Sequence, residues 1–260
     1  MMFMTHPQPS GGFEWTQEPW GAALRCAPLG RVAAHLFTTG NLRLVDDECE
    51  WKAVAGRLGV APHGIRLIRQ VHGVDVATVR AGSSQESAAR PEADVIISDD
   101  PEAAIGVRVA DCAALLLADR RTGVVGAAHA GWRGTLKSAA IVAADAMRAT
   151  FGSEPQDLVA AIGPCLGPCC GEVGPEVVEG FLAAGHPARE LAGWFSPGRG
   201  DRQHLNLWAA NRDQLLRAGV PASQIHVAEI CTQTHSALLH SYRAHGRKAG
   251  RMVGLIRAGT

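Results

Sequence analysis

The sequence predicts an α+β fold, in which a single domain holds mixed β-sheets with flanking helices. Short apolar segments typical of strands occur between helical segments, but they do not alternate regularly as in a doubly wound sheet. No internal repeat of fixed period and no long linker divides the 260 residues. A hydrophobic fraction of 47% supplies enough apolar side chains for one sizeable core. We therefore expect residues 21–260 to form one domain and residues 1–20 to form a loose N-terminal leader.

Composition narrows the classes of function. The formal net charge is zero and the chain is rich in apolar residues, which argues against disorder and against a nucleic-acid-binding surface. No apolar segment reaches the ~20 residues that a membrane span requires, and the N-terminal residues lack the pattern of a signal peptide. The seven cysteines show no disulfide-scaffold spacing, which favours a reducing compartment. We therefore expect a cytoplasmic protein that acts on small molecules.

Helices are expected where apolar residues recur at helical spacing between start and stop signals. Gly59 ends one such segment, and Pro175 lies in the first turn of another. The expected helices span residues 46–58, 136–152 and 175–184, with a strand followed by a helix at 204–219. The expected irregular segments are the polar loop 81–93 and residues 185–202.

Strands are expected where short runs of Val, Ile, Leu and Ala lie between turn residues. The expected strands are residues 32–40, 65–80, 93–100, 107–119, 124–129, 157–164, 225–232 and 252–257. The second of these is interrupted at His72-Gly73, where a glycine suggests a β-bulge that re-aims neighbouring side chains.

Two of these strands form the hairpin on which the functional interpretation depends. Residues 107–119 and 124–129 flank Arg120-Arg121-Thr122-Gly123, which has the composition of a tight turn. We expect Asp119 to pair with Val124 across this turn. That pairing fixes the register of every residue further along both strands.

The register places two candidate metal ligands on one face of the hairpin. Cys112 lies opposite Gly131, and His129 lies opposite Ala114, so Cys112 and His129 are diagonal neighbours with Cβ atoms roughly 7–8 Å apart or less. A thiolate at about 2.3 Å and an imidazole nitrogen at about 2.0–2.1 Å from one zinc ion are compatible with that separation.

The next motif, "HAGWRGT", has the features of an anion site. Gly131 and Gly134 allow tight backbone turns, and Thr135 is expected to cap the following helix. Arg133 together with the amides of the helix N-terminus would bind a phosphate or a carboxylate. For any one residue alone, a buried thiol, a core histidine or an ordinary helix start is the commoner explanation. The three features around one turn favour a site.

A catalytic zinc ion needs a third protein ligand and an open position. His72 is the best candidate among the eleven histidines, because it lies at a glycine-marked irregularity inside an apolar strand. A single histidine in a strand is more often a hydrogen-bonded core residue, so the residues alone leave both interpretations open.

Five motifs occur in an order that resembles a known family. They are "RQVHGVDV", "ADC", "HAGWRGT", "IGPCLGPCCGEVG" and "EICT". They resemble the laccase-domain proteins, also called multicopper polyphenol oxidase-like proteins, which include bacterial purine nucleoside phosphorylases. The resemblance implies that His72, Cys112 and His129 are the metal ligands and that the sheets pack as a sandwich. It also implies zinc-dependent phosphorolysis of adenosine, inosine, guanosine or related nucleosides, with adenosine deamination as a side activity.

The chain departs from the family pattern on the side where the substrate is expected. Gly40 stands where the family has an arginine, Gly171 replaces an aromatic residue, and Ala244 replaces the second arginine of an "SxRR" motif. Arg243 keeps the first arginine of that motif and is expected to assist Arg133 in holding phosphate. These departures make substrate identity the most open part of the prediction.

Two nearby carboxylates and three other functions stay open. Asp111 is expected to be a structural hydrogen-bond acceptor, and Glu172 is a second candidate for chemistry. A copper-dependent polyphenol oxidase is one alternative, since imidazole and thiolate also bind copper, although no His-x-His motif occurs. A second alternative is a metal-free amide hydrolase acting on cell-wall precursors, with Cys112 as nucleophile and His129 as base. The third is a non-catalytic zinc site, closed by one of the loop cysteines Cys165, Cys169 and Cys170.

Overall fold

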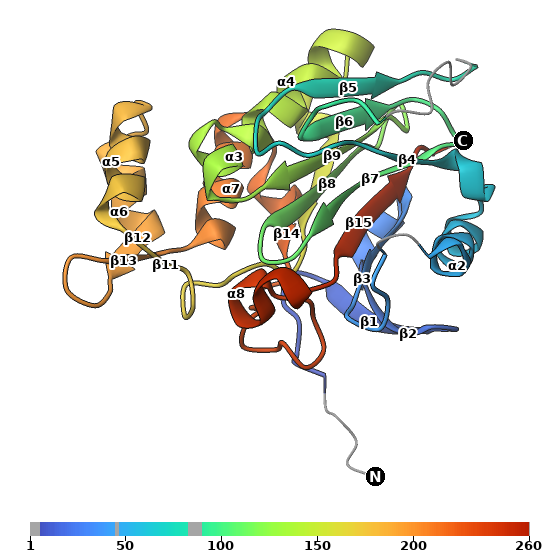
Figure 1. Cartoon of the computed structure of the whole chain (residues 1–260). Helices are drawn as coiled ribbons and strands as arrows, with labels where there is room; N and C mark the ends of the chain where they lie inside the picture. The colour runs from blue at the N-terminus through green and yellow to red at the C-terminus, as the bar shows by residue number, and fades with distance from the viewer. Residues whose placement is uncertain (1–5, 45–46, 83–89, 260) are drawn as a thin grey trace.

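The computed structural model describes residues 6–44, 47–82 and 90–259, and its core is a pair of six-stranded sheets (Figure 1). In spatial order the first sheet contains β1 (Phe13–Glu18), β2 (Gly21–Cys26), β3 (Ala34–Thr38), β15 (Met252–Arg257), β7 (Ala104–Val109) and β4 (Ile65–Leu67). The second contains β14 (Ile225–Val227), β10 (Leu158–Ile162), β8 (Ala113–Asp119), β9 (Val125–Ala130), β6 (Val95–Ser98) and β5 (Val76–Val79). A small third sheet contains β11 (Glu172–Val173), β13 (Gln203–Leu205) and β12 (Phe195–Pro197).

Helices flank these sheets. The α-helices are α1 (Ala27–Gly30), α2 (Glu48–Leu58), α3 (Trp132–Leu136), α4 (Ala139–Phe151), α5 (Pro175–Ala183), α6 (Ala188–Trp194), α7 (Leu207–Arg217) and α8 (Tyr242–His245). Short 3₁₀ turns are η1 (Pro62–Gly64), η2 (Pro155–Asp157), η3 (Ala222–Gln224) and η4 (Gly246–Lys248). Figure 1 shows α5 and α6 on one side of the molecule, next to the small third sheet. Within the described residues, no helix is long and apolar enough to cross a membrane.

Alternating side chains of β8 show how the layers pack. Leu116 belongs to the core between the two large sheets, whereas Leu115 and Leu117 belong to the core under α4 and α7. Both faces of β8 are therefore covered, which explains its uninterrupted apolar sequence. The outer face of the first sheet packs against α2 through residues such as Leu58 and Leu255. The predicted single α+β domain with mixed, sandwich-like sheets and flanking helices is confirmed.

The predicted hairpin register is confirmed, but its first strand is shorter than expected. Ala114 pairs with His129, and the amide of Asp119 donates to the carbonyl of Val124 at 2.8 Å. Residues 107–119 are not one strand, because β7 lies in the first sheet and β8 in the second. The chain crosses between the sheets at Asp111, whose φ of 89° breaks the extended backbone.

The segment 65–80 crosses between the sheets in the same way. β4 lies at the edge of the first sheet and β5 at the edge of the second. The predicted bulge is therefore wrong, since the irregularity is a crossover. At this crossover His72 has a left-handed backbone conformation, with φ 60°. Non-glycine residues rarely adopt this conformation, and it occurs preferentially at functional sites.

Three further expectations need correction. Residues 13–18 of the expected loose leader form β1, which pairs along its whole length with β2. Residues 185–202, expected to be irregular, contain α6 and β12. Thr135 does not cap the long helix, because it lies within the short helix α3, and α4 begins only after Ser138.

Other predicted boundaries agree with the structure. The helix expected at 46–58 is α2, in which the Asp47 carboxylate caps the first turn and Gly59 ends the last with φ 70°. Its expected first residue, Asp46, lies outside the described residues, as do residues 83–89 of the expected polar loop. The expected final strand, 252–257, is β15.

Candidate functional site

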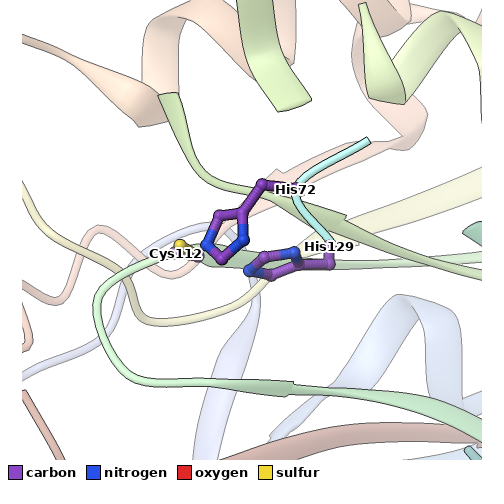
Figure 2. Close-up of side chains that lie close together, drawn as sticks. All are labelled: His72, Cys112 and His129. Atoms are coloured by element: carbon purple, nitrogen blue, oxygen red, sulfur yellow. The ribbon is translucent and has the colours of Figure 1, made fainter. Parts of the chain in front are cut away.

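The three predicted ligands converge at one point. His72, Cys112 and His129 each offer a ligand atom, and these atoms lie within 4.8 Å of one another. Figure 2 shows the two imidazole rings turned toward each other with the Cys112 sulfur beside them. The rings are 5.0 Å apart between centroids and meet edge to face at 77°. Two nitrogens and one sulfur at this spacing fit a metal ion that keeps an open position.

The fold explains why these residues meet. His72 lies on the crossover from β4 to β5, and Cys112 lies on the crossover from β7 to β8. His129 lies near the end of β9, the neighbour of β8. The site therefore forms where the chain passes twice between the two large sheets.

Asp94, which the sequence analysis missed, connects two of the ligands. Its buried carboxylate accepts hydrogen bonds from the amides of Val71 at 3.0 Å, His72 at 3.1 Å and Gly73 at 2.7 Å. Asp94 Oδ1 lies 2.7 Å from Nδ1 of His129. A carboxylate that accepts from one ring nitrogen of a histidine leaves the other nitrogen facing the metal position. Asp94 thus fixes the His72 loop and the His129 tautomer together.

The electrostatics of this group favour the thiolate form of Cys112. Burial by itself would raise the pKa of the Cys112 thiol, but His129 and His72 outweigh burial and lower this pKa to about 6. Burial acts to lower the pKa of His129, whereas the Asp94 carboxylate and Cys112 raise it to about 9. For Asp94, burial raises the pKa, and the hydrogen bonds from His129, Gly73 and Val71 lower it to about 2. Thiolate is the form that binds metals, and an entering cation must displace the His129 proton.

Gly131 provides the space that the sulfur occupies. A Cβ atom at this position would lie 2.5 Å from Cys112 Sγ, much closer than a methyl group and a sulfur can approach. The predicted position of Cys112 opposite Gly131 is therefore consistent with the structure, and the glycine is needed for close approach.

A cavity of about 590 Å³ opens beside the three ligands. Among the described residues, its lining includes one acidic residue, Asp111, and five arginines: Arg69, Arg108, Arg133, Arg243 and Arg251. Arg69 forms an ion pair with Glu92. The excess of positive charge favours an anionic ligand in this cavity.

Arg133 is the cavity arginine predicted from the sequence. Its guanidinium lies 4.1 Å above the ring of Trp132, a cation–π contact that orients it. Within the part of the chain that the structure describes, no carboxylate lies within ion-pair distance of Arg133. Gly134 and Thr135, predicted as its partners in anion binding, are buried outside the cavity lining. The Thr135 hydroxyl hydrogen-bonds instead with the side chain of Asn211.

Arg243 and Asp111 are two further residues of the cavity wall. Arg243 donates through Nη1 to the carbonyls of Cys170 and Glu172, each at 3.2 Å. Asp111 accepts from the Thr232 hydroxyl at 2.6 Å and from the Arg243 amide at 2.5 Å. Asp111 therefore has the structural role expected of it.

Glu172 and the three residues that depart from the family pattern, Gly40, Gly171 and Ala244, lie in different places. The Glu172 carboxylate forms ion pairs with Arg199 and Arg202. Gly171 lines the cavity, and a Cβ there would lie 2.6 Å from the Leu205 carbonyl. Gly40 and Ala244 are not part of the cavity lining. Gly171 is therefore the departure that changes the cavity wall directly.

A family model described as multi-copper polyphenol oxidoreductase laccase matches residues 44–259 of the chain. The chain belongs to this family. Among family relatives, purine nucleoside phosphorylase YlmD of Geobacillus stearothermophilus is 38% identical over 194 residues, which are 72% of this chain and 69% of the relative. Adenosine deaminase RL5, from an unknown prokaryotic organism, is 34% identical over 210 residues, 78% of this chain and 79% of the relative.

The family fold is also evident in a solved structure. The crystal structure of YlmD from Geobacillus stearothermophilus superposes with a TM-score of 0.82 at 29% identity, and covers 97% of this chain and 100% of that one. The laccase-type family expected from the sequence motifs is confirmed. Other relatives, from Bacteroides thetaiotaomicron and Escherichia coli, are also named purine nucleoside phosphorylase.

Proposed function

We propose that this chain is a zinc-dependent purine nucleoside phosphorylase, which cleaves adenosine, inosine, guanosine or a related nucleoside with phosphate. The observation that carries the proposal is one cavity that joins two imidazoles and a thiol to an arginine-rich wall. The relatives named purine nucleoside phosphorylase supply the reaction class. The seven cysteines are free thiols, which supports a cytoplasmic location. The net charge of zero gives no support to a nucleic-acid partner.

His72, Cys112 and His129 would hold the metal ion. Zinc accepts nitrogen and thiolate donors in this number and leaves one position open, and copper(II) accepts the same donors. When bound, such an ion acts as a Lewis acid that polarises an oxygen or lowers the pKa of a water molecule to ~7. Asp94 keeps the His129 ring in the orientation that binding requires.

The remaining steps belong to the cavity residues. Arg133 holds the phosphate dianion close to the ribose C1′, where a phosphate oxygen forms the new bond. The glycosidic C–N bond breaks, and its electron pair leaves with the purine, which takes up a proton. Trp132 and Tyr242 line the same cavity and offer aromatic faces to the base. Arg243 supports the wall by holding the carbonyls of Cys170 and Glu172.

Two further activities have specific support. Adenosine deamination as a side activity is supported by the relative named adenosine deaminase RL5. A thiol hydrolase is supported by the line of Cys112, His129 and Asp94, which resembles a nucleophile, a base and an orienting carboxylate. That mechanism gives His72 no role. Yet the ligand atoms of His72, Cys112 and His129 all lie within 4.8 Å of one another, close enough to share one ion. The second histidine therefore favours the metal enzyme.

The test combines metal analysis with product analysis. Untagged protein is assayed with adenosine, inosine and guanosine, with and without phosphate, and its zinc and copper contents are measured. The proposal requires zinc near one equivalent and the release of free base and ribose 1-phosphate only with phosphate. Release of free base at the same rate with and without phosphate would indicate hydrolysis. Full metal occupancy without nucleoside turnover would contradict the proposal. Metal-free protein with hydrolase activity that alkylation of Cys112 removes would support the thiol hydrolase instead.

A further inference from the structure

A second cluster of sulfur atoms lies apart from the His72–Cys112–His129 group. The thiols of Cys169, Cys170 and Cys231 lie within 4.8 Å of one another. Among the described residues that line the cavity, none is one of these three cysteines. Neither Cys165 nor the Cys169–Cys170 pair joins the first group, so the structure does not support a zinc site closed by a loop cysteine. The two clusters are separate sets of donors.

Backbone pairing fixes the positions of these thiols. Beyond the ends of β10 and β14, Cys165 and Cys231 form a parallel bridge. The Cys165 amide donates to the Ile230 carbonyl at 3.2 Å, and the Thr232 amide donates to the Cys165 carbonyl at 3.0 Å. On the other segment, the Cys170 amide donates to the Gly167 carbonyl at 3.0 Å. The sulfur atoms are therefore brought together by the fold before any ligand binds.

The chemistry of the donors selects the kind of ligand. The Thr234 hydroxyl lies 3.4 Å from Cys169 Sγ and 3.5 Å from Cys170 Sγ, and in the described part of the chain no imidazole or carboxylate belongs to this cluster. Hard cations need oxygen ligands, and structural zinc sites use four cysteine or histidine ligands. Thiolates without other donors select soft ions, of which copper(I) is the common biological example.

We propose that Cys169, Cys170 and Cys231 bind one copper(I) ion through three thiolates, at a site separate from the His72–Cys112–His129 group. Cys231 is buried and closes the inner side, whereas Cys169 is exposed and provides the path of entry. An ion held by three sulfurs, with one open side, is positioned for exchange with a thiol-rich donor or acceptor.

This site is connected to the cavity wall. Arg243 lines the cavity and donates to the Cys170 carbonyl at 3.2 Å. Thr232, next to Cys231, donates to Asp111 at 2.6 Å. The thiol site therefore lies on the same two segments that contact Arg243 and Asp111.

The experiment measures copper(I) binding by the reduced full-length chain in competition with a chromophoric copper(I) chelator, without oxygen. The parent protein is compared with Cys169→Ser, Cys231→Ser and the control Cys49→Ser, which removes an exposed thiol on α2. We expect one tight copper(I) in the parent and the control, with only sulfur neighbours in the X-ray absorption spectrum. Loss of a thiolate ligand should weaken copper(I) binding by at least about tenfold. Mutation of residues that only hydrogen-bond to metal ligands already lowers metal affinity by that factor.

A second variant distinguishes copper(I) binding at the two clusters. In Cys112→Ser protein, which lacks the thiol of the first group, the tight sulfur-only site should persist. Copper(I) binding by Cys169→Ser equal to that of the parent would overturn the proposal, and this exposed position avoids the folding risk at buried Cys231. Nitrogen neighbours around the copper would also overturn it, because they would assign the ion to the histidines. So would a reduced protein that binds no copper(I) and forms a Cys231 disulfide in air.

Discussion

The Asp94 carboxylate and the His129 imidazole lie 2.7 Å apart at the centre of the candidate site. The same carboxylate accepts the amides of Val71, His72 and Gly73. One buried acid therefore orients one histidine through its ring and a second histidine through its backbone. Since His72 has a left-handed φ of 60°, these hydrogen bonds also offset the cost of its conformation.

Replacement of this acid should weaken metal binding without removing any ligand. In Asp94→Asn the amide group presents N–H atoms to backbone amides that need an acceptor, and the His129 tautomer is no longer fixed. We expect zinc affinity to fall by about 10–100-fold. Zinc content and competition with a chelator measure the effect. Asp145→Asn, at an exposed position on α4, is the matched control and should keep the parent affinity. Equal affinities in both variants would remove Asp94 from the metal site.

Loss of the thiol should have a larger effect. Cys112→Ser replaces a thiolate with a hydroxyl group that stays protonated, so only two nitrogen ligands remain for the ion. We expect stoichiometric zinc binding and nucleoside cleavage to disappear together, while the fold persists. The control is Cys49→Ser, with zinc measured by elemental analysis and folding by circular dichroism. A Cys112→Ser protein that keeps a full equivalent of zinc would refute the ligand assignment.

Gly131 should be intolerant of even one extra methyl group. An alanine Cβ would lie 2.5 Å from Cys112 Sγ, although the φ of −77° at Gly131 suits alanine. We therefore expect Gly131→Ala to fold and to bind zinc more weakly, because the sulfur has to move. Gly56→Ala is the control, since a Cβ at Gly56 meets nothing within 4 Å. Parent-like zinc affinity in Gly131→Ala would show that the thiol position is not critical.

Arg133 should determine the use of phosphate. Removal of a charged hydrogen bond of about 1.5–3 kcal/mol lowers kcat/KM for phosphate by roughly 10–100-fold. Arg133→Ala should keep its zinc, because Arg133 is not one of the three ligands. Arg189→Ala, exposed on α6, is the control. The steady-state dependence on phosphate checks the expectation, and an unchanged KM and kcat would remove Arg133 from the reaction.

The hairpin could be predicted from the sequence because its register is set locally. A four-residue turn between apolar strands leaves few alternatives, so Ala114 was placed opposite His129 correctly. The end of the strand before Cys112 could not be predicted. Residues 107–119 are almost continuously apolar, and the change of sheet depends on the left-handed backbone of Asp111. Non-glycine residues rarely adopt this conformation, so the sequence does not indicate it.

Asp94 illustrates the other limit. A carboxylate at the start of a strand has many ordinary explanations, and its partners His72 and His129 lie 22 and 35 positions away along the chain. The pairing of β6 with β9 and the crossover from β4 to β5 bring the three together. For the same reason the sequence indicated Arg133 and Arg243, which lie in motifs, but not Arg69, Arg108 or Arg251. Their shared cavity exists only after both sheets have formed.

The final prediction concerns stability and a histidine far from the site. Buried His35 accepts a hydrogen bond from the Cys26 amide through Nε2 at 2.9 Å, and its Nδ1 donates to the Ala33 carbonyl at 3.0 Å. This arrangement fixes the neutral ring, because a proton on Nε2 would face another N–H group. Burial lowers the pKa of His35 to about 4 from an ordinary value of 6.5, against the raising effect of the Ala33 hydrogen bond.

The sign of the pH dependence follows from these values. Between pH 6.5 and about 4, the unfolded chain binds a proton at His35 that the folded chain does not. The free energy of unfolding therefore decreases as the pH falls through this range, by roughly 3 kcal/mol from this residue. Urea denaturation with a chelator present, at pH 7 and pH 4.5, should show a smaller decrease for His35→Gln than for the parent. His63→Gln, at an exposed position, controls for the loss of one imidazole. If His35→Gln loses as much stability as the parent between these pH values, then the acid sensitivity arises elsewhere. The variant has no imidazole at this position, so it cannot take up a proton there when it unfolds.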